Sequence, residues 1–185
     1  CVAAVKHLGS TITDNATCNM HQDLLEKRAA YITKNNELNQ EFHYAHPSTK
    51  IWLNNVFNTS FYGAPLWDIF SREFEKLEKS WNVSQRIMLS IPRTAHRYFI
   101  EPLSQTNHIA KSLKKRFVKF ISNIERSKKE VLRCVLQTIR NDCRSNTGKN
   151  LRNIKLRTVN FSPVDIVFTA EPYKENQDTW KINIV

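Results

Sequence analysis

Lysine and arginine side chains are concentrated in one stretch of this 185-residue chain. Residues 104–158 hold 15 Lys/Arg against three Asp/Glu, whereas residues 1–103 sum to +1 and residues 159–185 to −2. Ammonium and guanidinium groups neutralise phosphates and release counterions, so this concentrated positive field favours nucleic acid as the partner. The charge alone also fits a solvated basic face or, least well, an anionic lipid surface.

The spacing of the basic residues predicts one exposed helix face. Lys111, Lys115 and Lys119 recur at i, i+4 and i+8, opposite an apolar stripe and flanked by Lys114 and Arg116. We predict that this face contacts the nucleic-acid backbone without reading base sequence; the alternative is a helix face that is merely solvated. Weaker candidates further along the chain extend the same basic surface: Arg126, Lys128, Lys129, Arg133 and Arg140.

A connector over 92–103 offers a second candidate group. Arg93, His96 and Arg97 lie beside Tyr98 and Phe99. Arginine binds phosphate bidentately, and an aromatic ring can stack on a base. The alternative is a turn in which Tyr98 and Phe99 anchor a core.

Other reactive side chains show no catalytic or metal-binding pattern. The four cysteines form no Cys-x-x-Cys pair, the six histidines lack metal-ligand spacing, and no two aspartates are adjacent. We expect reduced thiols and no cofactor in this chain. No apolar run reaches about 18 residues and no signal-peptide pattern is present, so we expect a nuclear or cytoplasmic protein that is not secreted and has no membrane partner.

Apolar periodicity predicts a mainly α-helical bundle that positions these side chains. We predict a short β element over 2–13 before the bundle, and an irregular or β tail over 159–185. The expected helices cover about 14–38, 47–63, 68–91, 105–124 and 128–142, and Thr147-Gly148-Lys149-Asn150 reads as a turn into one more short helix.

Burial can be predicted for several of these helices. The 47–63 segment is apolar on almost every side, which is typical of a buried helix. We therefore place Trp52 in the core, together with Trp67 and Trp81. The 128–142 helix is expected to direct one apolar face inward: Val131, Leu132, Val135, Leu136 and Ile139.

Several short motifs resemble, in order, the C-terminal region of non-LTR retrotransposon reverse transcriptases. His7-Leu8-Gly9 resembles the Tyr-Leu-Gly segment that enters their thumb, with His7 in place of the usual Tyr. A second segment is similar to their downstream Tyr-Gly-x-x-x-Trp stretch: Ser60-Phe61-Tyr62-Gly63-Ala64-Pro65-Leu66-Trp67.

The resemblance continues through most of the remaining chain. In these enzymes a helix ends in a short connector that contains Pro and often Thr-His. The corresponding residues here are Trp81-Asn82-Val83-Ser84-Gln85-Arg86 and Ile91-Pro92-Arg93-Thr94-Ala95-His96-Arg97-Tyr98. The later matching pieces are Arg116-Phe117, Asp142-Cys143-Arg144-Ser145, Thr147-Gly148-Lys149-Asn150-Leu151-Arg152, Tyr173 and Trp180-Lys181-Ile182. The LINE-type, jockey-like branch is the most similar.

The resemblance implies a thumb and post-thumb region that grips template–primer RNA and DNA through its backbone. In this family an upstream palm holds two metal ions with an aromatic-x-Asp-Asp motif. We therefore expect this chain to be a fragment that lacks its partner palm and fingers, with Mg²⁺ belonging only to that palm, and to be inactive alone as an RNA-directed DNA polymerase. The implied organisation is a near-neutral thumb-like segment over 1–103, a basic helical module over 104–158 and a tail over 159–185.

A different class of function stays open beside the polymerase fragment. The chain could act as a stand-alone, non-catalytic nucleic-acid-binding protein derived from a mobile element. It could also be a helical interaction protein of the same origin.

Overall fold

The computed structural model describes residues 4–7, 10–13, 20–142 and 144–158, and their fold is mainly α-helical, as predicted. The strands are β1 (Ala4–His7) and β2 (Ser10–Thr13), which pair antiparallel within the β element expected over 2–13. The larger helical elements are α1 (His21–Glu41), α2 (Pro47–Leu53), α3 (Arg72–Met88), α5 (Ile109–Glu125), α6 (Glu130–Asn141) and α7 (Asn146–Thr158). Shorter turns are η1 (Asn54–Asn58), η2 (Ala64–Leu66), η3 (Arg97–Phe99) and α4 (Ile100–Ser104). The predicted C-terminal tail lies outside the described residues.

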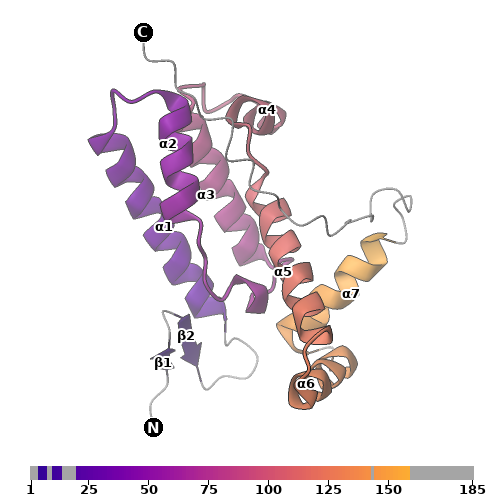
Figure 1. Ribbon diagram of the computed structural model, residues 1–185. Coiled ribbons are helices and arrows are strands. Elements are labelled where there is room, and N and C mark those ends of the chain that lie inside the picture. Colours follow the sequence, from indigo (N-terminus) through magenta and orange to yellow (C-terminus); the bar gives the residue numbers. More distant parts are fainter. Residues whose placement is uncertain (1–3, 8–9, 14–19, 143, 159–185) are drawn as a thin grey trace. The chain divides into compact units, whose positions relative to one another are not determined.

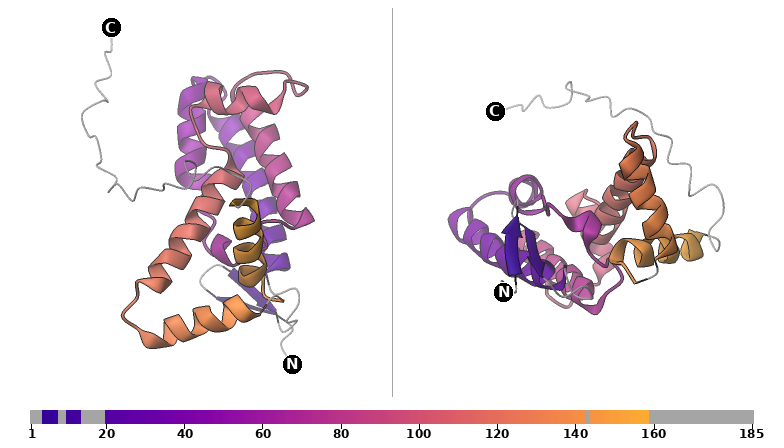
Figure 2. Two further views of the ribbon diagram at one scale, coloured as in Figure 1. Left: turned by 90° about the vertical axis from the view of Figure 1, so that its right-hand side faces the viewer. Right: turned by 90° about the horizontal axis from the view of Figure 1, so that it is seen from below.

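The chain divides into two compact units, residues 1–153 and 154–185, and every contact described below lies within the first. In that unit α1, α2 and α3 pack alongside one another (Figure 1), and α3 also contacts α4 and α5. Figure 2 shows the same helices from two further directions. None of the described helices is both long enough and apolar enough to cross a membrane.

Helix α3 buries one apolar face, and Trp81 lies on it as predicted. Ser71 caps the helix by accepting a hydrogen bond from the Phe74 amide at 3.2 Å. Phe74, Leu77, Trp81 and Met88 are all at most 2% exposed, so the four-and-three spacing does mark the side that packs inward.

Trp67 is buried as predicted, and it joins the loop before α3 to α1. Its indole Nε1 donates to the carboxylate of Asp23 at 2.7 Å, and both residues are fully buried. The ring also meets Phe61 edge-on, with centroids 5.6 Å apart. A buried indole that satisfies its N–H in this way contributes packing without leaving a polar group unpaired.

The prediction of a buried helix over 47–63 is wrong. The α-helix ends at Leu53 and continues as the π-helical turn η1. Ile51 is buried, but Trp52 is 56% exposed and Phe57 62% exposed, and Val56 is exposed as well. Helix α2 packs mainly against η1 and α3, and its outer apolar side chain Trp52 remains exposed.

A polar group of side chains occupies the core between α1, η1 and α3. Tyr31, Asn35, Asn54 and Gln85 are each at most 1% exposed. Burial raises the pKa of Tyr31 to about 12, which neighbouring polar side chains offset only in part. The phenol therefore stays protonated at every physiological pH.

The helix predicted over 128–142 forms as α6, but most of its apolar face is not buried. Leu136 is only 3% exposed, as expected, and Ile139 is half-buried. Val131 is 74% exposed, and Leu132 and Val135 are exposed too. The packing of α6 against α5 thus covers one turn of the apolar face rather than all of it.

The turn predicted at residues 147–150 is instead the first part of α7. Asn150 is fully buried there: its Oδ1 accepts from the Ile69 amide at 3.1 Å, and its Nδ2 donates to the Trp67 carbonyl at 2.6 Å. Gly148 is needed because a Cβ at that position would collide with the carbonyl oxygens of Asp142 and Ile139. The start of α7 therefore lies close against the end of α6 at Gly148, and the Asn150 amide bonds it to the core.

Candidate nucleic-acid interface

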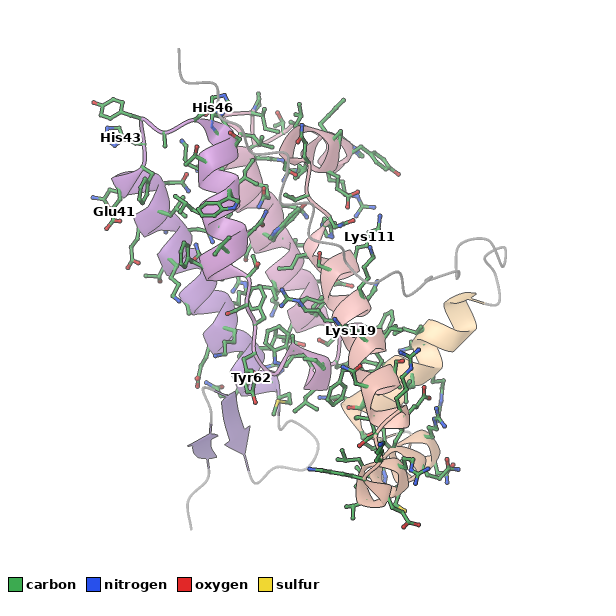
Figure 3. The ribbon with its side chains drawn as sticks, in the orientation of Figure 1. Glu41, His43, His46, Tyr62, Lys111 and Lys119 are labelled. Carbon is green, nitrogen blue, oxygen red and sulfur yellow. The ribbon has the colours of Figure 1, made fainter. Side chains whose placement is uncertain are left out.

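Helix α5 presents an exposed row of three lysines, which we call the lysine row: Lys111, Lys115 and Lys119. On the opposite side Leu113, Phe117 and Ile121 are buried. Each row lysine precedes one of these apolar residues by two positions, about 200° around the helix. Lys111 and Lys119 are labelled in Figure 3, and at 1.5 Å per residue the row extends for about 12 Å.

Lys114 and Arg116 flank the row, and the structure gives both of them internal contacts. The Lys114 ammonium lies 5.2 Å from the centre of the Phe70 ring, a cation–π distance. Arg116 donates from Nη1 to the carbonyls of Thr59 and Ser60 at 3.0 and 2.7 Å. These two residues therefore attach α5 to earlier segments in addition to adding charge.

The weaker candidates lie in and before α6, and one of them is paired. Arg140 forms a hydrogen-bonded ion pair with Glu125 at the end of α5. All of the other candidates have exposed side chains: Arg126, Lys128, Lys129 and Arg133. The Arg140 contact fastens α6 to α5, a role that the sequence pattern did not indicate.

At the connector, the alternative that Tyr98 and Phe99 anchor a core is wrong. Tyr98 is 75% exposed and Phe99 58% exposed, and the buried anchor is Ile100. The side chains of Arg93, His96 and Arg97 are exposed as well. The connector therefore presents both its basic and its aromatic side chains to solvent.

A hollow of about 290 Å³ adjoins this connector. Its lining comes from α3, η3, α4 and the residue before α5: Glu78, Arg97, Tyr98, Glu101, Pro102 and His108. His108 caps α5 by accepting from the Ala110 amide at 3.3 Å, and its ring meets Trp81 edge-on at 4.7 Å. The hollow is thus built from several packed elements rather than from one loop.

Burial governs the electrostatics of this hollow. It raises the pKa of Glu78 and lowers that of His108, although the two side chains approach to 3.9 Å. Both shifts disfavour the charged forms, so we regard the pair as a polar contact rather than a strong ion pair. Glu101 is engaged differently, since its carboxylate accepts from the His108 amide at 2.8 Å.

The predicted residues gather at the two ends of α5. The connector group lies beside the N-terminal end, because Arg97 and Tyr98 share the hollow with His108. The α6 group follows the C-terminal end, and the lysine row runs between them. Sequence reasoning missed Glu78, Glu101 and His108; only the position of His108 directly before an apolar stripe hinted at a helix cap.

Comparisons with protein families, with curated proteins and with solved structures find no match to this chain. Within the described residues no group of three His, Cys, Asp or Glu side chains could hold a metal ion.

Proposed function

We propose that this chain is the thumb and C-terminal part of a non-LTR retrotransposon reverse transcriptase, which holds template–primer nucleic acid through its phosphate backbone. The observation that carries the proposal is the lysine row, exposed on α5 directly opposite a buried apolar stripe. Three cations on a rigid helix suit contact with phosphates, which needs charge rather than a base-specific pattern. The ordered sequence motifs supply the link to this class of enzyme.

Under this proposal the chain binds nucleic acid but does not itself catalyse DNA synthesis. In the enzymes it resembles, polymerisation uses adjacent carboxylates that hold two metal ions. The sequence has no adjacent aspartates, and Mg²⁺ would belong to the palm. We therefore expect no nucleotide incorporation on a primed template with Mg²⁺ or Mn²⁺, and incorporation by this chain alone would contradict the proposal.

The binding half of the proposal is tested by charge reversal on the lysine row. The triple variant Lys111→Glu, Lys115→Glu, Lys119→Glu should bind an RNA–DNA hybrid duplex more weakly than the wild-type chain. Each lost phosphate contact should also lower the slope of log K against log salt by about 0.7–0.9. Fluorescence anisotropy over a range of salt concentrations measures both quantities.

A matched control variant carries the same charge change elsewhere: Lys34→Glu, Arg72→Glu, Lys79→Glu. These three positions are exposed on α1 and α3. If binding depends on net charge alone, the control will weaken as much as the row variant. Equal weakening, or unchanged binding by a folded row variant, would overturn the assignment of the row.

A second candidate function, a helical interaction protein derived from a mobile element, is favoured by the exposed apolar side chains of α2–η1 and α6. Trp52, Phe57 and Val131 are each more than half exposed. Exposed apolar surface of this kind promotes association. Light scattering coupled to gel filtration distinguishes the candidates, because this function predicts association that persists in high salt and no binding to nucleic acid.

A further inference from the structure

Exposed rings form a platform on the connector between α3 and α5, which we call the aromatic platform: His96, Tyr98 and Phe99. Tyr98 is three-quarters exposed and Phe99 more than half exposed. Aromatic residues of this size normally gain stability by burial, so their exposure calls for an explanation.

The backbone that carries the platform is fixed at several points. Arg86 on α3 donates from Nε to the Ala95 carbonyl at 2.9 Å, and the His96 ring accepts from the Tyr98 amide at 3.4 Å. Ile100, directly after the platform, is fully buried. These contacts therefore fix the turn from which the rings extend into solvent.

One face of the Tyr98 ring is already stacked. The His96 and Tyr98 rings lie 4.8 Å apart with an interplanar angle of 23°. Given its 75% exposure, Tyr98 keeps surface for a further planar group next to the hollow that it lines with Arg97 and His108. A flat π-system stacked there would extend the His96–Tyr98 pair.

Charge around the platform favours an anionic ligand. Arg93 and Arg97 are exposed on the same connector, and Lys111 of the lysine row follows the hollow's His108 by one helical turn. Two carboxyl groups beside the hollow oppose an anion: Glu101, which accepts from the His108 amide, and Glu78. Burial raises the pKa of Glu78, which disfavours its charged form.

We propose that the aromatic platform stacks an unpaired base of single-stranded nucleic acid, while Arg93 and Arg97 contact the adjoining phosphates. Stacking suits every base because each has a π-face, and the arginines supply the backbone charge. The inference rests on the proposed function and adds to it a ligand class, the unpaired strand, that backbone contact by the lysine row does not require.

The test compares a single strand with its duplex for three tyrosine variants. Labelled strands of about ten nucleotides, alone and annealed to a complement, are titrated with the full chain by fluorescence anisotropy. The variants are Tyr98→Ala, Tyr98→Phe, which keeps the stacking ring, and Tyr44→Ala. Tyr44 is the matched control because it is 94% exposed in the turn between α1 and α2.

We expect Tyr98→Ala to weaken single-strand binding by roughly 5- to 140-fold, the effect of losing one base–aromatic stack. Duplex binding should change by less than about twofold, and the salt slope should stay the same because no phosphate contact is lost. Tyr98→Phe and Tyr44→Ala should bind both ligands like the wild-type chain. Circular dichroism verifies that each variant is folded.

The outcomes separate this inference from the proposed function. One result would overturn only the role of the aromatic platform. In it, Tyr98→Ala weakens binding of the single strand and of the duplex equally, or weakens neither, while the lysine-row variant still weakens duplex binding. If the wild-type chain binds no nucleic acid at low salt, both are overturned. Unchanged oligonucleotide binding together with Tyr98-dependent association of the chain would assign the platform to protein contact instead.

Discussion

Replacing Asn150 by alanine should detach the start of α7 from the core. The amide of Asn150 bonds to the backbone of two buried residues, Ile69 and Trp67, at 3.1 and 2.6 Å. Alanine leaves a buried N–H and a buried carbonyl without their partner, and each orphaned group costs about 1–3 kcal/mol. With two such groups, we expect the free energy of unfolding to fall by about 2–6 kcal/mol.

Urea unfolding followed by circular dichroism measures this loss, and Asn36→Ala provides the matched control. Asn36 lies on the exposed side of α1, so the same substitution there should change the free energy of unfolding by no more than about 0.5 kcal/mol. A loss below about 1 kcal/mol for Asn150→Ala would refute the reasoning. It would mean that other contacts, or rearranged backbone, hold α7 in place.

Two further predictions concern the core and the hollow. Trp81→Ala, at a position 1% exposed, should lower the free energy of unfolding by about 3–5 kcal/mol, whereas Trp52→Ala, 56% exposed, should lower it by less than about 1 kcal/mol; comparable losses in urea unfolding would contradict the assigned burial. Burial raises the folded-state pKa of Glu78, so its contribution to stability is complete below the unfolded pKa and lost as pH rises through the folded one. Relative to the wild type, Glu78→Gln should therefore gain stability as pH rises above about 4, near the unfolded pKa of glutamate, and a relative loss with rising pH in paired urea titrations would contradict this sign.

Helices with one clean apolar stripe could be predicted from the sequence. In α3 and α5 the stripe is narrow and the opposite side is charged, so only one orientation buries the apolar residues. Phe74, Trp81 and Phe117 are buried for that reason. The position of the lysine row followed from the same periodicity, because it lies opposite the stripe of α5.

Burial on α2 and α6 could not be predicted, because a hydrophobic pattern does not say whether anything covers it. Trp52 and Val131 are apolar residues on amphipathic or wholly apolar segments, yet no described element packs over them. The mistaken core role of Tyr98 has the same origin. Whether such a ring turns inward depends on the path of the connector, which Ile100 and the Arg86–Ala95 hydrogen bond determine.

The contacts that each basic residue makes within the chain determine which substitution tests the interface most clearly. Arg116 bonds to carbonyls more than 50 positions earlier, and Arg140 pairs with Glu125 on the neighbouring helix; periodicity shows neither contact. Substituting either residue would disturb packing as well as charge, so weaker binding would be ambiguous. The lysine row is exposed along its whole length and lies opposite the buried stripe, so reversing its charge alters the field of α5 while leaving the contacts that hold the helix intact.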